Sequence, residues 1–332
     1  MRRRTFLGTL VGAGVLSLAP ALPLLAAPEP AKGMMTLTFD DGLASVHKYA
    51  LPILKRRNLA AVAGIVANRV IAANDDYMNR QQVRDLQDAG WEIASHSLSH
   101  VRPISIPGLY AQERVQGWEA DPKHPDTYQA EYLFDIITGM YQDGKALAEV
   151  GKLDEIYHHA GTYYFDRPIA ELRVHPFQAG PAGALDIRVG SYQRELEQSK
   201  RMLGEDGFKV SSYVAPYNYW TAETKDTSKK YYSRAATGGD TDNRPGAFDP
   251  YAIQRFIVHS DNSAGTIIRL AENSVNQGAW AVLCLHGVED KVGWEPWAAA
   301  NLEALCAWIA DKAVPLVTLE QGCNIMLGAA RG

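Results

Sequence analysis

Short apolar runs alternate with segments of helical periodicity at the start of this 332-residue chain, and this alternation restricts the fold more than any other feature. Apolar, β-prone residues cover 34–39, 60–67 and 91–95. Between them, Leu43–Arg57 and Asn79–Ala89 have helical spacing, and Gly90 follows the second segment as a common helix stop. Strand–helix–strand alternation is typical of parallel strands joined by crossover helices. We therefore predict an α/β fold around a parallel sheet.

The middle of the chain does not follow this rhythm. Residues 101–186 contain many prolines and aromatic residues, and we predict that they form a large insertion into the main domain. Its aromatic side chains, such as Tyr163 and Phe165, favour a small hydrophobic core of its own over a sugar-binding wall. After the insertion the alternation returns, and we expect helices at 191–203 and 301–311 and strands at 209–215, 279–285 and 314–318.

The N-terminus has the pattern of an export signal. Arg2, Arg3 and Arg4 precede an apolar run that reaches Ala27, and the segment ends in small residues. Arg3–Leu7 resembles the twin-arginine signal of bacteria, which a receptor reads as an address. We predict a signal peptide over 1–27, a linker over 28–33, a main domain over 34–332 and a periplasmic or secreted protein. An uncleaved membrane anchor is the alternative, although the prolines and glycines of the run favour cleavage.

The charge of the chain excludes one class of partner. The formal net charge is −5, and removal of the three N-terminal arginines with the signal makes it more negative still. A nucleic-acid backbone is held by clustered Lys and Arg in excess, so we expect no nucleic-acid binding. After signal cleavage we also expect no stable membrane insertion.

Three polar clusters follow predicted strands at their carboxyl ends. They are Thr38–Gly42 with its paired aspartates, His96–His100 with histidines at both ends, and Leu283–Gly287 with one histidine. Each alone is a weak signal, because Asp-Asp-Gly is usually a turn and two histidines four residues apart often occur by chance. In barrels of parallel strands the active site lies at the carboxyl ends of the strands, so the three clusters are expected to meet there.

Two imidazoles and one carboxylate make a good site for Zn²⁺ or another divalent transition metal. Three protein ligands leave a fourth position for water, as in catalytic zinc sites. Zinc lowers the pKa of that water towards about 7. A second carboxylate can accept its proton, and an acid on the far side can protonate the leaving amine during amide hydrolysis.

These clusters resemble the motifs of the polysaccharide deacetylase family, the carbohydrate esterase family 4 enzymes with a NodB-type domain. Residues 38–42 match the first motif, 96–100 the second, 213–217 the third and 283–286 the fifth. The resemblance covers 34–100 and 191–321, and it implies a distorted (β/α) barrel with fewer than eight strands. The site residues that it implies are Asp40 as catalytic base, His286 as catalytic acid, and Asp41, His96 and His100 as metal ligands.

The resemblance also implies a substrate-binding set. The backbone N–H of Tyr217, after Pro216, is expected to stabilise the oxyanion, and Leu283 to line the pocket for the acetyl methyl. Trp220 lies near this face in sequence and is a candidate platform for a sugar ring. Cys284, within an apolar run, is interpreted as a buried small hydrophobe.

Two departures from the family pattern stand out. The third motif of the family begins with an arginine that contacts the catalytic base, and Val214 occupies that position here. The fourth motif, an Asp and Trp set that supports the catalytic histidine, is not recognisable. Arg255 is a candidate to fill part of the role of the fourth motif, and Asp249 and Asp261 are weaker candidates.

The sequence therefore predicts a metal-dependent hydrolase that removes the N-acetyl group from N-acetylhexosamine units of a polysaccharide or oligosaccharide and releases acetate. The alternatives are an O-acetyl esterase or a deformylase on the same scaffold, and a carbohydrate-binding relative without turnover.

Overall fold

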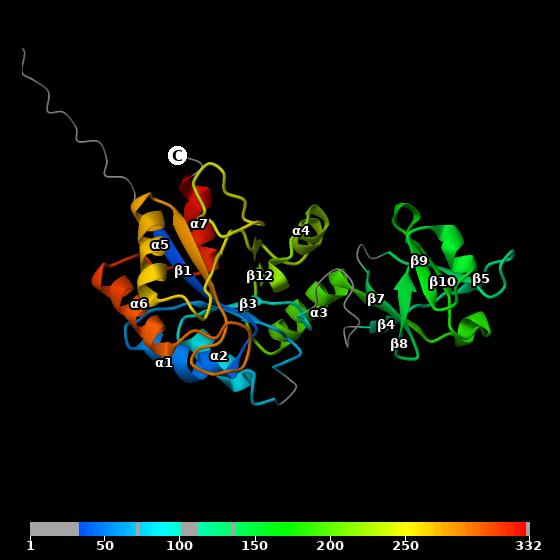
Figure 1. The fold of residues 1–332 in the computed structure, drawn as a ribbon, viewed down its shortest axis with the longest axis horizontal. Helices are drawn as coiled ribbons and strands as arrows, with labels where there is room; N and C mark the ends of the chain where they lie inside the picture. The colour runs from blue at the N-terminus through cyan, green and yellow to red at the C-terminus, as the bar shows by residue number, and fades with distance from the viewer. Residues whose placement is uncertain (1–32, 71–73, 101–111, 134–136, 330–332) are drawn as a thin grey trace, which may run out of the picture. The chain divides into compact units, whose positions relative to one another are not determined.

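The computed structural model describes residues 33–70, 74–100, 112–133 and 137–329. The signal peptide and almost all of the linker predicted above lie outside the described residues. Within them, a curled parallel sheet and a separate antiparallel sheet organise the chain (Figure 1). No helix among the described residues is both long enough and apolar enough to cross a membrane.

The parallel sheet has seven strands, and all of its neighbouring strands run in the same direction. In spatial order the strands are β13 (Arg234–Ala236), β12 (Ser212–Val214), β3 (Glu92–Ser95), β2 (Val62–Ile65), β1 (Met34–Phe39), β15 (Trp280–Leu285) and β14 (Phe256–Ile257). A parallel bridge between Ala236 and Ile253 joins β13 to the segment that leads into β14. The two edges of the sheet are thus linked, and the predicted distorted (β/α) barrel is confirmed.

Seven α-helices accompany these strands within the described residues. They are α1 (Leu51–Lys55, which continues a π-helical turn at Val46–Ala50), α2 (Arg80–Asp88), α3 (Tyr192–Glu205), α4 (Ala222–Lys229), α5 (Ala264–Asn276), α6 (Ala299–Asp311) and α7 (Leu319–Ala329). Short polar side chains fix several starts: Asn79 caps α2 in a reciprocal box with Gln82, and Ser191 accepts the N–H of Arg194 at the start of α3.

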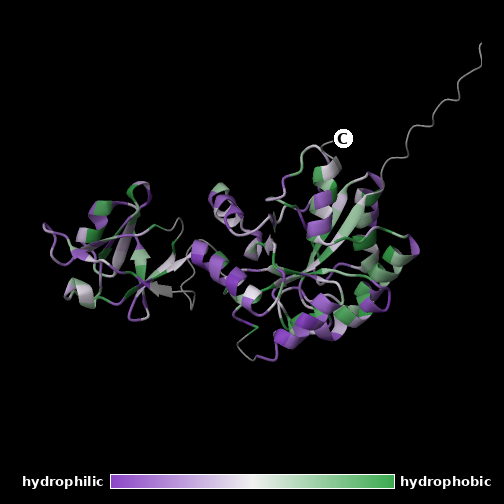
Figure 2. Ribbon diagram, turned by 180° about the vertical axis from the view of Figure 1, so that it is seen from behind, coloured by the Kyte–Doolittle hydropathy of each residue, from purple (hydrophilic) through white to green (hydrophobic). Residues whose placement is uncertain are grey.

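Side chains of the barrel strands alternate between two environments, as the period of two requires. Along β1, Met35, Leu37 and Phe39 belong to the core that packs against the surrounding helices. Thr36, Thr38 and Asp40 have the opposite parity and face the barrel interior, where Trp280 Nε1 donates to Thr36 Oγ1 at 2.9 Å. The barrel strands are hydrophobic along most of their length, whereas α3 is mainly hydrophilic (Figure 2).

The interior is apolar at the amino ends of the strands and polar at their carboxyl ends. In the apolar part of the interior, Trp280 and Val282 pack with Leu319, Cys323 and Met326 of α7. Gly322 of α7 has no room for a side chain, because a Cβ would lie 2.3 Å from the Trp280 indole. The strand predicted at 314–318 is wrong: Leu316 forms only a single bridge to Met35, and the chain then enters α7.

The insertion forms an eight-stranded sheet with a hydrophobic core of its own. In spatial order its strands are β4 (Gln112–Arg114), β11 (Ile187–Ser191), β7 (Ile137–Gln142), β8 (Lys145–Glu149), β9 (Thr162–Asp166), β10 (Glu171–His175), β6 (Tyr128–Glu131) and β5 (Glu119–Ala120). Only β8 and β9 pair in parallel. Tyr163 and Phe165 are buried in this core, as expected for aromatics that stabilise the insertion itself. The sheet continues through β11, past residue 186, where we had expected the insertion to end.

Candidate active site

The turn after β1 brings two adjacent carboxylates to the carboxyl end of the barrel. Asp40 continues the inward parity of the strand, and its N–H donates to Leu285 O at 2.9 Å. Asp41 then adopts a left-handed backbone, with φ of 73°, and Gly42 does the same with φ of 70°. Aspartate and glycine tolerate this region better than most residues. The turn therefore directs the two neighbouring side chains to different partners.

The loop after β3 carries both histidines of the second motif in a tight, strained turn. Ser97 and His100 have φ of 65° and 59°, and the N–H of His100 donates to Ser97 Oγ at 2.9 Å. Glu195 of α3 fixes the loop from outside: Ser99 Oγ donates to Glu195 Oε1 at 2.5 Å and Ser99 N to Oε2 at 2.9 Å. Glu195 is fully buried, so it is a polar anchor on the inward face of a mainly hydrophilic helix.

Asp41, His96 and His100 converge as a set of metal ligands would. Asp41 Oδ1 lies 3.5 Å from His96 Nε2 and 3.1 Å from His100 Nε2, and the ligand atoms of the three residues are all within 4.8 Å of one another. Asp41 Oδ1 is buried without a hydrogen-bond partner among the described residues. His96 Nδ1 lies 2.8 Å from the carbonyl of Val214, which can hold the proton on Nδ1 and leave Nε2 as the ligand. These residues fit a divalent transition metal.

The pKa shifts of Asp41 and His100 also suit a metal. Burial alone would raise the pKa of Asp41, but its close contact with His96 and the nearby imidazoles lower it well below the ordinary value. Burial, together with the charge of His96, lowers the pKa of His100 to about 3. An ionised carboxylate, as at Asp41, and a neutral imidazole, as at His100, are forms that bind metal ions.

Asp40 is paired with an arginine rather than aimed at the metal set. Arg255 Nη1 lies 2.9 Å from both Oδ1 and Oδ2 of Asp40, and both side chains are almost fully buried. The rest of the guanidinium is also engaged: Nη1 donates to Thr38 Oγ1, Nε to Thr237 O and Nη2 to Asn218 Oδ1. Burial would raise the pKa of Asp40, but the charge of Arg255 and smaller contributions from His96 and His286 lower it. Asp40 is thus held as a carboxylate.

Arg255 therefore has a different role from the one we considered in the sequence. We had compared it with the fourth motif, which supports the histidine, and the structure instead gives it the contact with Asp40 that the third-motif arginine makes in the family. The segment that joins β13 to β14 supplies the charge that Val214 lacks. Asp249 pairs closely with Lys225, and the Asp261 side chain is exposed, so neither takes the role of the fourth motif.

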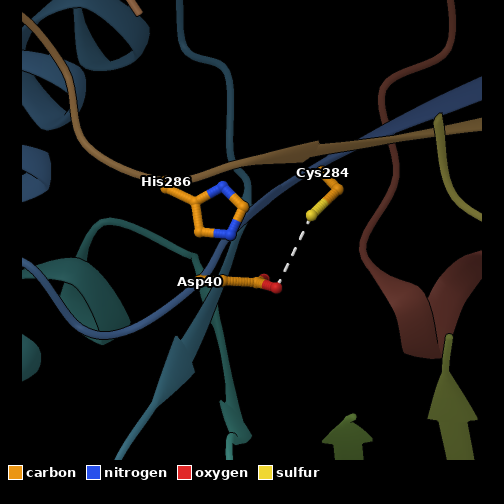
Figure 3. A group of neighbouring side chains, drawn as sticks. All are labelled: Asp40, Cys284 and His286. Carbon is orange, nitrogen blue, oxygen red and sulfur yellow. Dashed lines mark hydrogen bonds between the residues drawn. The ribbon is translucent and has the colours of Figure 1, made fainter. Parts of the chain in front are cut away.

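His286 lies on the other side of Asp40 at the end of β15, with a ring nitrogen directed towards the carboxylate (Figure 3). Its Nδ1 is buried without a hydrogen-bond partner among the residues that the structure describes. The exposed indole of Trp294 meets the imidazole edge to face, with centroids 4.9 Å apart. Burial lowers the pKa of His286.

Cys284 contacts the Asp40 carboxylate, which its interpretation as a buried hydrophobe did not foresee. Its Sγ donates to Asp40 Oδ2 at 3.6 Å (Figure 3). Asp40, Cys284 and His286 could by distance hold a second metal. Arg255 already occupies both oxygens of Asp40, however, and burial raises the pKa of the Cys284 thiol far above neutrality. A cation needs the thiolate and a free carboxylate, so this group is better suited to proton transfer.

A cavity of about 650 Å³ connects these groups. Its walls carry all five of the main site residues from the sequence, together with Arg255 and Tyr217, whose ring lies 4.6 Å from that of His100. The side chains that sequence reasoning did not assign to this wall are Arg69, Tyr77, Asn218, Ile257 and Cys284. Trp294 and Trp297, three residues apart in the loop after His286, are both candidate platforms for a sugar ring from the sequence, and only Trp294 lines this cavity among the described residues.

Three residues of the predicted substrate-binding set lie elsewhere. Leu283 has the outward parity of β15 and packs against the helices, so the inward neighbour Cys284 takes the place at the cavity. Trp220 packs on Tyr213, with ring centroids 6.2 Å apart. Pro216 is buried at the start of the short 3₁₀ turn that gives Tyr217 its left-handed backbone, with φ of 57°. Pro216 thus shapes the turn without lining the cavity.

The contact from Glu195 leads to a prediction about metal affinity. Glu195→Gln keeps the size of the side chain but removes the charge that holds Ser99 between the two histidine ligands. Loss of such supporting contacts commonly weakens metal binding by about 10–100-fold. We expect that loss for zinc in a chelator competition, with Glu197→Gln on the same helix unchanged. Equal affinities in the two variants would show that the loop holds its shape without Glu195.

Comparison with known proteins agrees with the motifs. The family model described as polysaccharide deacetylase matches residues 27–121. Among curated proteins there is no match. Similar solved structures include the Xyl-CE4 domain of a multidomain xylanase from the hindgut metagenome of Trinervitermes trinervoides, with 13% identity, a TM-score of 0.45 and coverage of 88% of this chain and 90% of that chain.

A family 4 carbohydrate esterase from Streptomyces lividans, solved in complex with acetate, is 14% identical with a TM-score of 0.42 and coverage of 87% of this chain and 92% of that chain. A de-N-acetylase from Aggregatibacter actinomycetemcomitans is 18% identical with a TM-score of 0.41 and coverage of 71% and 74%. The family match spans the first two motifs, which carry both aspartates and both histidine ligands. Over residues 27–121 the chain is thus similar to the polysaccharide deacetylase family.

Proposed function

We propose that this protein is a metal-dependent deacetylase that hydrolyses the N-acetyl group of N-acetylhexosamine units in a polysaccharide. The observation that carries the proposal is one cavity that combines two separate sets of groups. A ligand set of Asp41, His96 and His100 stands beside Asp40 and His286, which can move protons. Amide hydrolysis needs both, because the carbonyl must be polarised and the amine must be protonated as it leaves.

Asp41, His96 and His100 would hold the metal, which we propose to be zinc. When bound, the ion supplies a Lewis acid that polarises the acetyl carbonyl. The backbone N–H of Tyr217 is proposed to donate to the oxygen that becomes negative when the carbonyl carbon is attacked.

Asp40 and His286 divide the proton transfers. Asp40, ionised by Arg255, accepts a proton from the attacking water as the oxygen bonds to the carbonyl carbon. His286 protonates the nitrogen as the C–N bond breaks, so that acetate and a free amine result. Because ligand-type atoms of Asp40 and His286 lie within 4.8 Å of each other, the proton taken by Asp40 can return to the imidazole.

The walls of the cavity suit a sugar ring. Tyr217 and Trp294 are large aromatic side chains that are about half exposed at its rim. Aromatic faces offer apolar area to the C–H faces of a pyranose, and the polar side chains between them can bind hydroxyl groups.

We also propose that residues 1–27 direct export through the twin-arginine route, so that the enzyme acts in the periplasm or outside the cell. The basic start, the apolar run and the small-residue end support this location. N-terminal sequencing of the chain recovered from cell fractions tests it, and a full-length chain confined to the cytoplasm would contradict it.

Metal removal tests the proposed function. The chain from about residue 31 onward is assayed for acetate release from N-acetylglucosamine and N-acetylgalactosamine polymers and oligomers. We expect release with zinc, loss to background after chelation, and recovery when zinc is restored at one equivalent per chain. O-acetylated and N-formylated substrates are assayed in parallel. Preference for either of these, or release that withstands chelation, would contradict the proposal.

A further inference from the structure

Arg69 is a cation on the wall of the catalytic cavity whose charge the proposed chemistry does not use. It follows β2, in the turn at 67–70, and is partly buried. Its guanidinium lies over the ring of Tyr77, 4.5 Å from the centroid. Among the described residues, no carboxylate lies within 4.0 Å of it to form an ion pair. Such a contact holds one face of the guanidinium and leaves its N–H edges able to bind a ligand.

The other charged side chains of the catalytic cavity already have partners or a proposed role in metal binding. Four of its lining side chains carry full charge at neutral pH: Asp40, Asp41, Arg69 and Arg255. Asp40 is neutralised by Arg255 at 2.9 Å, and Asp41 belongs to the ligand set. With a divalent ion on that set, the cavity has an excess of positive charge. Arg69 therefore adds a cation to a site that favours an anionic ligand over a neutral or cationic one.

Arg69 and Tyr77 also form the wall of a second, neighbouring cavity. This cavity has a volume of about 260 Å³, and its lining includes the Asn74 amide and the solvent-exposed carboxylate of Asp75. The same two side chains thus belong to both the catalytic cavity and its neighbour. A group bound by Arg69 would therefore lie where the two cavities adjoin, beside a ring held in the catalytic cavity.

We infer that Arg69 binds the carboxylate of a sugar next to the ring that is deacetylated, so that the preferred substrate joins N-acetylhexosamine to a carboxylated sugar such as a hexuronate. This inference rests on the proposed function and names its substrate class. A guanidinium binds a carboxylate through two parallel N–H···O bonds, which adds direction to the charge attraction. By the same argument, a neighbouring ring with a free ammonium group is repelled.

The test uses matched oligosaccharides that differ only in one carboxyl group. Acetate release is measured for N-acetylhexosamine oligomers with hexuronate neighbours and for the same oligomers after reduction of the carboxyl to an alcohol. A hydrogen bond to a charged group corresponds to about a ten- to hundred-fold effect. We expect the wild type to favour the hexuronate oligomer by that factor in kcat/KM, mainly through KM, and less so at high salt.

Arg69→Gln should abolish this preference, whereas Arg69→Lys should keep part of it. Arg80→Gln is the matched control, since Arg80 is exposed on α2 and pairs with Asp206. Equal rates for both oligomers in the wild type, or a preference that survives Arg69→Gln, would overturn the inference. Stronger preference for a phosphorylated neighbour would overturn the carboxylate assignment.

A binding measurement separates this inference from the proposed function. Titration calorimetry of the zinc-loaded enzyme with the two deacetylated oligomers measures affinity without turnover. If no substrate releases acetate but the hexuronate oligomer binds more tightly through Arg69, the proposed function fails and the inference stands. If acetate is released but the two oligomers bind equally, the inference fails alone.

Discussion

Asp40→Asn will lower kcat for acetate release by about 10²–10⁴-fold, the usual contribution of a positioned general base. The substitution is nearly isosteric and keeps a hydrogen-bond acceptor for Arg255. The amide cannot accept the proton of water at neutral pH, so the chemical step is slowed while substrate still binds. Kinetics on an N-acetylhexosamine oligomer, with metal content measured on the same samples, test this expectation.

Two matched variants separate the base from the metal set. Asp41→Asn should lose metal affinity as well as activity, because Asp41 Oδ1 faces both histidine ligands at 3.5 Å or less. Asp88→Asn, at an exposed position on α2, should leave both unchanged. Full activity in Asp40→Asn would rule out Asp40 as the base. Loss of metal in Asp40→Asn would instead assign it to the ligand set.

Local sequence pattern was enough to predict the barrel strands with strong apolar runs. β1, β2, β3 and β15 are buried along nearly all of their length, so each reads as a continuous apolar run. The clusters that follow them meet at the same end of the sheet, because parallel strands share their carboxyl edge. The grouping of Asp40, Asp41, His96, His100 and His286 in one cavity follows from that geometry.

The weaker strands were beyond such reasoning. β14 has only two residues. The segment before it, residues 250–255, is joined to the β13 side of the barrel by backbone hydrogen bonds, which leave no periodic pattern of side chains in the sequence. The apolar run at 314–318 has the composition of a strand, yet only Leu316 bridges to β1. Tertiary contacts override propensity in segments this short.

The side of the strand to which a residue points explains why the sequence misplaced Leu283 and Cys284. A shift of one position along a strand moves a side chain from the interior to the helix-facing side. Leu283 therefore packs in the outer core, and Cys284, which looked like part of an apolar run, contacts Asp40. Glu195 and Arg255 could not be assigned to their partners from sequence, because they reach Ser99 and Asp40 from elements 96 and 215 positions away.

Arg255→Gln will move the acid limb of the activity profile to higher pH and lower kcat/KM at neutral pH. Arg255 is the main favourable charge beside Asp40, whose burial alone would raise its pKa. Without the guanidinium, burial is opposed only by the weaker imidazole contributions, so the pKa of Asp40 rises. The base is active as a carboxylate, so more of it is protonated and inactive at a given pH. We expect a loss of about 100-fold, within the range of general-base catalysis.

The same change should destabilise the fold, and the pH dependence of stability has a definite sign. Removal of one partner of a buried ion pair costs about 3–5 kcal/mol. In the wild type, the lowered pKa of Asp40 contributes stability above the pKa of the unfolded chain, and this contribution is lost as the pH falls through the folded value. In Arg255→Gln that contribution is absent, so the difference in unfolding free energy from the wild type should be largest near neutral pH and shrink in acid.

Matched variants distinguish charge from packing. Arg255→Lys keeps a positive charge but cannot bind Asp40, Asn218 and Thr237 at once, so its acid limb should lie between those of the wild type and Arg255→Gln. Arg244→Gln removes an exposed arginine that pairs with Asp242, and it should change the free energy of unfolding by less than about 0.5 kcal/mol. If Arg255→Gln lowers stability but leaves the acid limb in place, the arginine supports the barrel and does not tune the base. If the acid limb moves in Arg255→Gln and moves only part of the way in Arg255→Lys, the positive charge at this position controls the pKa of Asp40. The segment between β13 and β14 then supplies the charge that the third-motif arginine supplies in the family pattern.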